Sequence, residues 1–336
     1  MDRTRPSLVA TAGSLNELSS AAALAEEAGF ESVWSTEFYD RSATISLCAM
    51  AQATERVELG TAIAYAFGRT PLVLAAEARD LAEITGGRFT LGLGTGTKRM
   101  QRDWHGLDGE SPALRMEELV PLIRKLWRLH EGPVEHEGRF YRVRVHPTAS
   151  VVPPPSGEIP IYMAGVNARM IQAAGTVGDG LVGHPLFTPE YVRDVVRPAL
   201  ARGAERAERD EPVPIAGYLT CSVGEDREEA RAAARAVVAF NSTVKTYEAI
   251  HRHHDFLPHL ERIREAWRAR DLAAMAAAVP DEMLDTIALA GTADEVTERF
   301  AERWAGVYER TLLWPPAFRG PDAMRAAIEA FAAARV

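Results

Sequence analysis

The sequence has 336 residues, of which 47% are hydrophobic and 25% charged, an ordinary composition for a globular protein. Its net charge is −9, with 47 acidic against 38 basic residues, and this balance argues against a nucleic acid or an anionic membrane as partner. No apolar run approaches the ~18 residues of a membrane-spanning helix. Cys48 and Cys221 stand far apart in the chain, as expected for reduced thiols in a cytoplasmic protein.

Short apolar runs alternate with amphipathic segments along the chain. We predict eight strands, at residues 7–11, 31–35, 57–63, 88–93, 160–164, 180–183, 213–223 and 310–313. Most are followed by a predicted helix, at 21–28, 44–54, 71–84, 167–176, 189–206, 292–305 and 321–334. Parallel βαβ units in series predict an α/β fold, a closed (β/α)8 TIM barrel, with a doubly wound open sheet as the alternative.

Two segments interrupt this rhythm, at about 131–157 and 241–286. The first contains a predicted hairpin at 134–143 and the run Pro153-Pro154-Pro155, and the second is helical. We expect both to be insertions at the C-terminal face, over the mouth of the barrel. Neither has the composition of a flexible linker, so residues 1–336 are predicted to form one domain.

Three strand ends have features that suit a flat or phosphorylated ligand, although each is equally typical of an ordinary strand–loop–helix junction. Residues 60–71 place small side chains between a strand and a helix that begins at Pro71. Residues 86–97 are glycine-rich, but Thr97 stands where a dinucleotide fingerprint needs its third glycine, and no Gly-Lys-Ser/Thr follows. Residues 161–169 start a helix just after Gly165, where free N–H groups favour a phosphate.

In combination these segments resemble the luciferase-like monooxygenase family. The resemblance covers residues 7–223 and 291–313. It rests on Trp34-Ser35-Thr36-Glu37, Gly60-Thr61-Ala62-Ile63, Arg69-Thr70-Pro71, Gly87-Arg88-Phe89-Thr90-Leu91-Gly92-Leu93-Gly94-Thr95-Gly96, Pro160-Ile161-Tyr162-Met163-Ala164-Gly165, Ala174-Gly175 and Asp179-Gly180-Leu181, in this order.

This resemblance implies a cofactor, either FMN or the deazaflavin coenzyme F420. It implies a bulge, often with a cis peptide, at Thr61, Ala62 and Ile63 that backs the cofactor ring. Further cofactor contacts are expected at Gly94, Thr95, Gly96 and Thr97, and from Ala164, Gly165, Val166 and Asn167 to the phosphate. Glu37 occupies the acidic position near the ring, and Glu37 and Tyr39 are the catalytic candidates.

The chain departs from the family's sugar-phosphate dehydrogenases at two positions. Phe38 and Thr97 stand where those enzymes have a His and a Glu, so oxidation of sugar phosphates is not expected. The Thr36-Glu37 pair and the Gly-Thr-Gly-Thr loop favour F420 and hydride transfer to or from a small organic substrate. An FMN-dependent monooxygenase and a non-catalytic deazaflavin-binding protein are the alternatives.

Three further expectations concern partners and ions. Small apolar residues at 43–53 and 72–81 favour helix packing between two subunits, hence a homodimer. Lys98 and Arg99 are placed to meet the acidic oligoglutamate tail of F420, although an exposed surface pair is equally expected. The spacing of four histidines would allow a metal site; they are His251, His253, His254 and His259. We instead expect a solvated or mouth-facing helix here, and no metal.

Overall fold

The structure, a computed structural model, describes residues 5–154 and 158–333. Eight parallel strands pair side by side and close on themselves, because the last pairs with the first, Ser7 opposite Leu312. In ring order they are β1 (Ser7–Ala10), β2 (Ser32–Ser35), β3 (Glu58–Thr61), β5 (Phe89–Gly94), β8 (Ile161–Ala164), β9 (Gly180–Val182), β10 (Ile215–Val223) and β12 (Arg310–Trp314). The predicted TIM barrel is confirmed.

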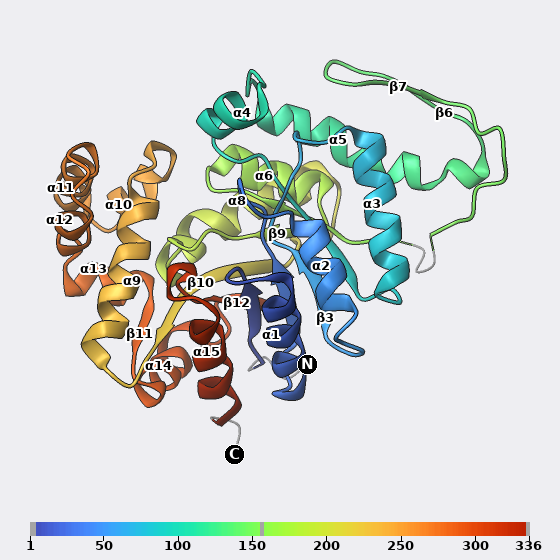
Figure 1. The fold of residues 1–336 in the computed structure, drawn as a ribbon. Coiled ribbons are helices and arrows are strands. Elements are labelled where there is room, and N and C mark those ends of the chain that lie inside the picture. Colours follow the sequence, from blue (N-terminus) through green and yellow to red (C-terminus); the bar gives the residue numbers. More distant parts are fainter. Residues whose placement is uncertain (1–4, 155–157, 334–336) are drawn as a thin grey trace.

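Helices surround this ring (Figure 1). They are α1 (Leu15–Glu27), α2 (Ala43–Ala51), α3 (Pro71–Ile84), α4 (Lys98–His105), α5 (Pro112–Trp127), α6 (Ala168–Val177), α7 (Pro189–Tyr191), α8 (Arg197–Arg206), α14 (Ala293–Arg299) and α15 (Pro321–Ala333). Two predicted helices contain a π-helical turn, at Val192–Val196 and Phe300–Trp304. Ala334, the last residue predicted for the final helix, lies outside the described residues.

The start and end of α1 show how the sequence sets these helices. Ser14 and Glu17 form a reciprocal capping box at its start, so the first free amides find acceptors. Gly29 follows with φ +75°, a conformation that glycine adopts without steric cost, and the chain turns there toward β2. The buried face of α1 consists of Leu18, Ala21, Ala22 and Ala25.

The hairpin between α5 and β8 differs from expectation in its place. It pairs β6 (Val134–Glu137) with β7 (Arg142–Val145) in antiparallel register. The hairpin lies beside residues 67–72 at the C-terminal face, as predicted, but it projects outward beyond α5 and does not cover the mouth (Figure 1). Glu118 on α5 fixes it, since the carboxylate accepts hydrogen bonds from the Phe140 and Tyr141 amides and from His136. Residues 155–157 of this predicted insertion lie outside the described residues.

The second insertion is helical, as predicted. Before it comes α9 (Arg227–Ser242), a helix after β10 that the sequence analysis did not predict. The insertion itself contains α10 (Glu248–His253), α11 (Leu257–Arg268), α12 (Leu272–Ala277) and α13 (Asp281–Ile287), and these helices stand beside the barrel (Figure 1). They lead to β11 (Leu289–Gly291), a short strand on β10 that the sequence analysis did not predict. Among the described residues, no helix combines the length and apolar character needed to span a membrane.

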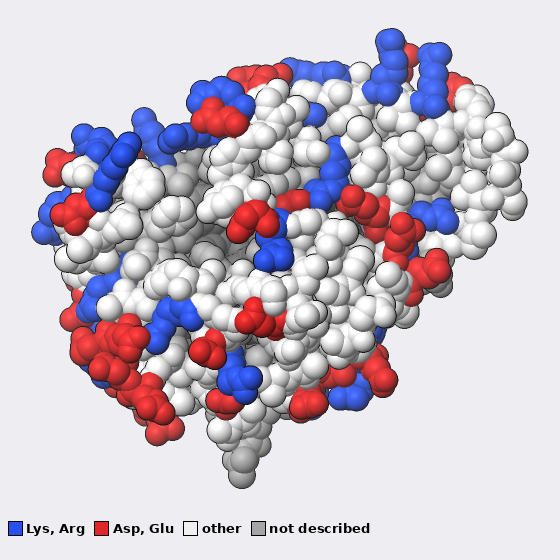
Figure 2. All heavy atoms as spheres, viewed as in Figure 1, with Lys and Arg blue, Asp and Glu red and all other residues white. Residues whose placement is uncertain are grey.

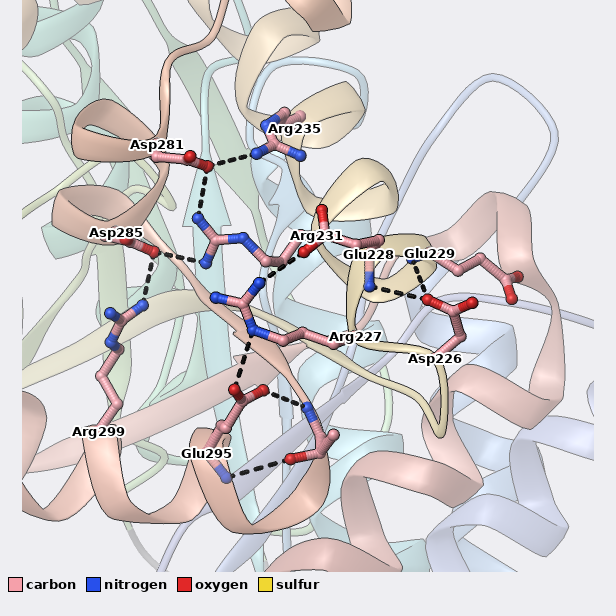
Figure 3. Close-up of polar contacts among 11 residues, drawn as sticks. Asp226, Arg227, Glu228, Glu229, Arg231, Arg235, Asp281, Asp285, Glu295 and Arg299 are labelled. Atoms are coloured by element: carbon pink, nitrogen blue, oxygen red, sulfur yellow. Dashed lines mark hydrogen bonds and ion pairs between the residues drawn. The ribbon is translucent and has the colours of Figure 1, made fainter.

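An ion-pair network fixes the base of this insertion (Figure 3). The buried Arg231 of α9 donates to Asp281 and Asp285 of α13, at 2.7 Å each. Arg299 of α14 donates to the same Asp285 at 2.6 Å. Because Asp285 accepts hydrogen bonds from both α9 and α14, the network joins α13 of the insertion to helices that surround the barrel.

Candidate active site at the barrel mouth

The backbone after β3 forms the bulge that the resemblance implied, and the Ala62–Ile63 peptide is cis. Neighbouring elements hold it on several sides. The Ala62 amide donates to the Ser35 carbonyl at 2.7 Å, and the Glu37 amide donates to the Ile63 carbonyl at 3.1 Å. The buried Tyr218 hydroxyl donates to the Ala62 carbonyl. The bulge therefore presents Ile63 from a fixed backbone.

Glu37 holds the loop that follows the bulge. One carboxylate oxygen accepts from the Tyr65 amide (2.7 Å), and both accept from the Arg69 guanidinium (2.8 Å each). Arg69 also donates to Glu77 at 2.9 Å. The hydrogen bond to Glu37 raises the pKa of Arg69 although burial opposes the shift. Since both oxygens of Glu37 are engaged, this side chain anchors the loop in the structure as it stands.

Three expected cofactor residues come together beside the bulge. A Cβ at Gly94 would lie 2.7 Å from Cγ1 of Ile63 and 3.2 Å from Cβ of Ala164, so glycine is what lets Ile63 and Ala164 approach β5. Below them lies the apolar interior of the barrel, formed by Val9, Trp34, Ala62, Val182, Ala216, Tyr218 and Leu312. A flat apolar ring fits such a surface.

The start of α6 has unpaired backbone donors. Asn167 caps the helix, and its side chain accepts from the Met170 amide at 3.0 Å. The amides of Val166, Asn167, Ala168 and Arg169 find no acceptor among the described residues. Several free N–H groups at the positive end of a helix dipole are a suitable arrangement for a phosphate.

The side chains of four other expected residues are occupied elsewhere or exposed. The Thr61 hydroxyl donates to the Gly92 carbonyl (2.8 Å), the Thr95 hydroxyl donates to the Gly96 carbonyl (3.0 Å), and Thr97 caps α4. These three hydroxyls shape the loops. Tyr39 is 74% exposed, and its ring contacts Phe38 and Trp104. Tyr39 is therefore part of an exposed aromatic cluster, and it is not one of the residues that bind the Glu37 carboxylate.

Sequence reasoning missed His184, which follows β9 at the C-terminal face. Its Nδ1 accepts from the Leu186 amide at 3.3 Å, so the proton of the neutral ring is on Nε2. Burial, with the nearby His251, lowers the pKa of His184 to about 3. The ring lies 3.9 Å from that of Tyr247 in the insertion, where burial raises the tyrosine pKa to about 12. Its position directly after the end of the strand predicted at 180–183 was the available signal.

A hollow lies between the insertion helices and the body of the barrel (Figure 2). Its visible walls are uncharged side chains, and charged residues gather on the rim. The contact between His184 and Tyr247 places the insertion against the C-terminal face, as predicted for this segment. The site therefore has an apolar interior and a mouth covered on one side by the insertion.

The histidines of the insertion correct one expectation. His251 is fully buried, and its ring nitrogens have no hydrogen-bond partner among the described residues, so of the two expectations, a solvated or a mouth-facing helix, the solvated one is wrong at this residue. His254 shares a hydrogen bond of 2.7 Å with Thr188, and His253 lies 3.4 Å from Asp194. Across residues 5–154 and 158–333, no group of three or more potential ligands is arranged for a metal ion.

The sequence is similar to proteins of known and unknown activity. The sequence model described as luciferase-like monooxygenase matches residues 1–309. The chain is 31% identical over 288 residues to the 5,10-methylenetetrahydromethanopterin reductase of Archaeoglobus fulgidus, covering 83% of each protein. It is also 31% identical over 302 residues to an uncharacterized protein of Mycobacterium tuberculosis, covering 87% of this chain and 88% of that one.

Solved structures of two F420-dependent enzymes are also similar to this chain. The coenzyme F420-dependent tetrahydromethanopterin reductase of Methanopyrus kandleri superposes with a TM-score of 0.81 at 25% identity, covering 98% of this chain and 97% of the other. An F420-dependent secondary alcohol dehydrogenase gives 0.73 at 22% identity, covering 99% of each, which shows the shared fold. With its barrel, its bulge after β3 and the match over most of its length, the chain belongs to the luciferase-like monooxygenase family.

Proposed function

We propose that this protein is a coenzyme F420-dependent oxidoreductase that transfers hydride to or from a small organic substrate at the barrel mouth. The observation that carries the proposal is the likeness of this chain to reductases along most of its length. The chain is 31% identical to one methylenetetrahydromethanopterin reductase over 83% of its residues, and it superposes on a coenzyme F420-dependent reductase with a TM-score of 0.81. The residues fit the cofactor, because the Ile63, Gly94 and Ala164 surface suits a flat ring and the free amides of α6 suit a phosphate.

The bound deazaflavin would supply the carbon that gives or takes hydride, and the protein binds, orients and excludes water. Ile63 would back the ring, and Glu37 keeps the loop of Ile63 in place through Tyr65 and Arg69. The Nε2 hydrogen of His184 would be donated to a carbonyl or imine of the substrate and would pass to that oxygen or nitrogen as hydride reaches the carbon, with solvent at the mouth returning a proton to the ring. Glu37 and Tyr39 remain proposed contacts of the cofactor and substrate.

Titration with two cofactors tests this assignment. Protein fluorescence, and that of the cofactor, is followed while F420 or FMN is added at equal concentrations. We expect saturable binding of F420 and weaker binding of FMN. Tight FMN binding without F420 binding would instead make the protein an FMN-dependent member of the family. Absence of turnover with enones, imines and alcohols, despite F420 binding, would favour the non-catalytic binding protein.

We also propose a homodimer in the cytoplasm. Ile45 on α2, and Leu72 and Val73 on α3, are exposed large apolar side chains on the two helices expected to pack between subunits. Cys48 and Cys221 are both free thiols, which suits a reducing compartment. Light scattering at micromolar concentration should give twice 36.7 kDa, and Leu72→Glu should shift the mass toward the monomer. A mass of 36.7 kDa for the unaltered protein would exclude the dimer.

A further inference from the structure

Three exposed aromatic side chains gather on the segments that follow β2 and β5, at the C-terminal face of the barrel. They are Phe38, Tyr39 and Trp104, the exposed aromatic cluster. The Phe38 ring centre lies 4.3 Å from that of Tyr39 and 5.2 Å from that of Trp104, and the Tyr39 ring lies 5.7 Å from Trp104. Single exposed apolar side chains are common, but those that gather in one place are typical of a binding surface.

The cluster adjoins the proposed cofactor site. Its first two members directly follow Glu37, whose carboxylate accepts from the Tyr65 amide at 2.7 Å. The Trp104 ring centre lies 6.4 Å from that of Tyr65, and a Cβ at Gly96 would lie 3.4 Å from Cε1 of the same tyrosine. Tyr65 therefore joins the cluster to the loops after β3 and β5, where the cofactor ring is proposed to bind.

A second aromatic pair faces Tyr65 from the insertion. The rings of His184 and Tyr247 lie 3.9 Å apart. Burial raises the pKa of the Tyr65 phenol, and Glu37 and Tyr247 raise it further, so Tyr247 lies within electrostatic reach of Tyr65. The mouth thus has aromatic side chains on two sides, one set on the loops after the barrel strands and one against the insertion.

The polar groups around this part of the mouth are neutral or already paired. His184 is uncharged, because burial, with the nearby His251, lowers its pKa to about 3. Lys98, Arg99 and Arg102 of α4 are exposed, and each pairs with a carboxylate. An ionic group that left water for this surface would lose its hydration without an unpaired charge among these residues to compensate it.

We propose that the exposed aromatic cluster binds a flat, uncharged aromatic ring of the substrate, and that Trp104 is the residue that selects this ring. The inference rests on the proposed function, because the carbonyl or imine attached to the ring would lie between His184 and the cofactor. Trp104 contacts Phe38, Tyr39 and Tyr65, yet 41% of it is exposed, so part of the indole is open to a ligand. Edge-to-face and offset contacts favour an aromatic ring over a saturated ring of the same size.

The experiment measures dissociation constants for two ketones on the protein saturated with oxidised F420. Oxidised F420 has no hydride to give, so a ketone binds without turnover. The probes are acetylnaphthalene and acetyldecalin, which share a carbon skeleton and a carbonyl but differ in the π face. Calorimetry should show about ten-fold tighter binding of acetylnaphthalene, the effect of one or two ring contacts beyond the area that they bury. Acetylnaphthoate, which adds a carboxylate, should bind more weakly than acetylnaphthalene.

Four variants assign this preference to the cluster. Trp104→Leu removes the indole face and Trp104→Phe keeps a ring. Trp267→Leu is the matched control, because Trp267 is also 41% exposed and also meets a phenylalanine edge-on, Phe240 at 5.9 Å. Trp104→Leu should lose the preference for acetylnaphthalene, whereas Trp104→Phe and Trp267→Leu should keep it. Phe38→Leu should reduce the preference, and this variant decides the result if Trp104→Leu does not fold.

Three results would overturn the proposal: equal affinity of the unaltered protein for the two ketones, a preference retained in both Trp104→Leu and Phe38→Leu, or an equal loss in Trp267→Leu. Light scattering on the same samples tests the other use of an exposed apolar surface. A lower mass for Trp104→Leu, with its ketone preference intact, would make the cluster a subunit contact and would also overturn the proposal.

The same titrations on the cofactor-free protein separate this inference from the proposed function. Failure of F420 to bind would contradict the proposed function. A preference for acetylnaphthalene that is present without cofactor and lost in Trp104→Leu would still support the aromatic subsite, and equal binding of both ketones would overturn it.

Discussion

Single side chains hold the backbone of the site in place, and Tyr218 does so from the barrel interior. It is buried on β10, its ring meets Trp314 edge-on at 5.6 Å, and its hydroxyl donates to the Ala62 carbonyl. Burial raises the pKa of this phenol, so it remains a neutral donor at every physiological pH. The strand that contains Tyr218 was predicted from its apolar run, but the contact with Ala62 arises only when the ring of strands closes.

Tyr218→Phe should lower both stability and cofactor affinity. Removal of the hydroxyl leaves the Ala62 carbonyl buried without its donor, at a cost of about 1–3 kcal/mol in the free energy of unfolding. Tyr308→Phe is the matched control, because the Tyr308 hydroxyl is buried with no described partner and its loss should be neutral or stabilising. Denaturant melts and F420 titrations measure both effects. Equal losses in the two variants would show that Tyr218 acts through packing alone.

At the scale of elements, the proposed binding of the cofactor phosphate at the start of α6 can be tested with a substitution that leaves the packed side chains unchanged. A side chain at Gly165 would lie 3.0 Å from the Ile171 amide nitrogen and 3.1 Å from Cγ of Met170. Gly165→Val would therefore disturb α6 as well as any phosphate. Ala168 is exposed at the first helical position, and the preceding Asn167 has ψ 153°, a conformation that tolerates a following proline.

Ala168→Pro removes one free amide donor and should leave the melting temperature almost unchanged. Affinity for F420 should fall about ten-fold, the effect of one hydrogen bond to a charged group. The deazaflavin chromophore without its phosphate serves as the ligand control, and its affinity should not change. If F420 affinity is retained in folded Ala168→Pro, the phosphate does not bind at this amide.

The elements were more predictable from the sequence than the site. The periodicity of apolar residues located the eight barrel strands, and helix-start residues such as Ser14 and Pro71 located the helices between them. The strand β11 has only three residues, too few for a periodic pattern, and it was not predicted. The family motif correctly brought Ile63, Gly94 and Ala164 to one place. Contacts such as His184 with Tyr247 join residues 63 positions apart, and no local pattern records them.

For the whole molecule, the buried histidine of the insertion makes stability depend on pH. Burial, with a smaller effect of Arg264 and His254, lowers the pKa of His251 from 6.5 to about 4. Between these values the unfolded chain binds the proton and the folded chain does not. The stabilisation is therefore complete above pH 6.5 and is lost progressively as the pH falls toward 4.

We expect His251 to account for about 3 kcal/mol of acid destabilisation between neutral pH and pH 4. His251→Leu should be as stable as the unaltered protein at pH 7 and more stable at pH 5, because no buried ring has to be protonated. The buried neighbour Ile250 offers Ile250→Leu as a control that changes packing beside His251 but removes no titratable group. Unfolding curves in urea from pH 7 to pH 4.5 measure the difference, and parallel profiles for all three proteins would refute it.

The pairing of β12 with β1 sets the order in which the protein can be completed during synthesis. Leu8 lies beside Leu313, so β1 lacks one of its two neighbours until β12 has left the ribosome, about 300 residues later. Until then the edges of the incomplete sheet are open to other chains. Contacts of such long sequence separation also slow folding, so the edge of β1 stays open while all the residues between β1 and β12 are synthesised.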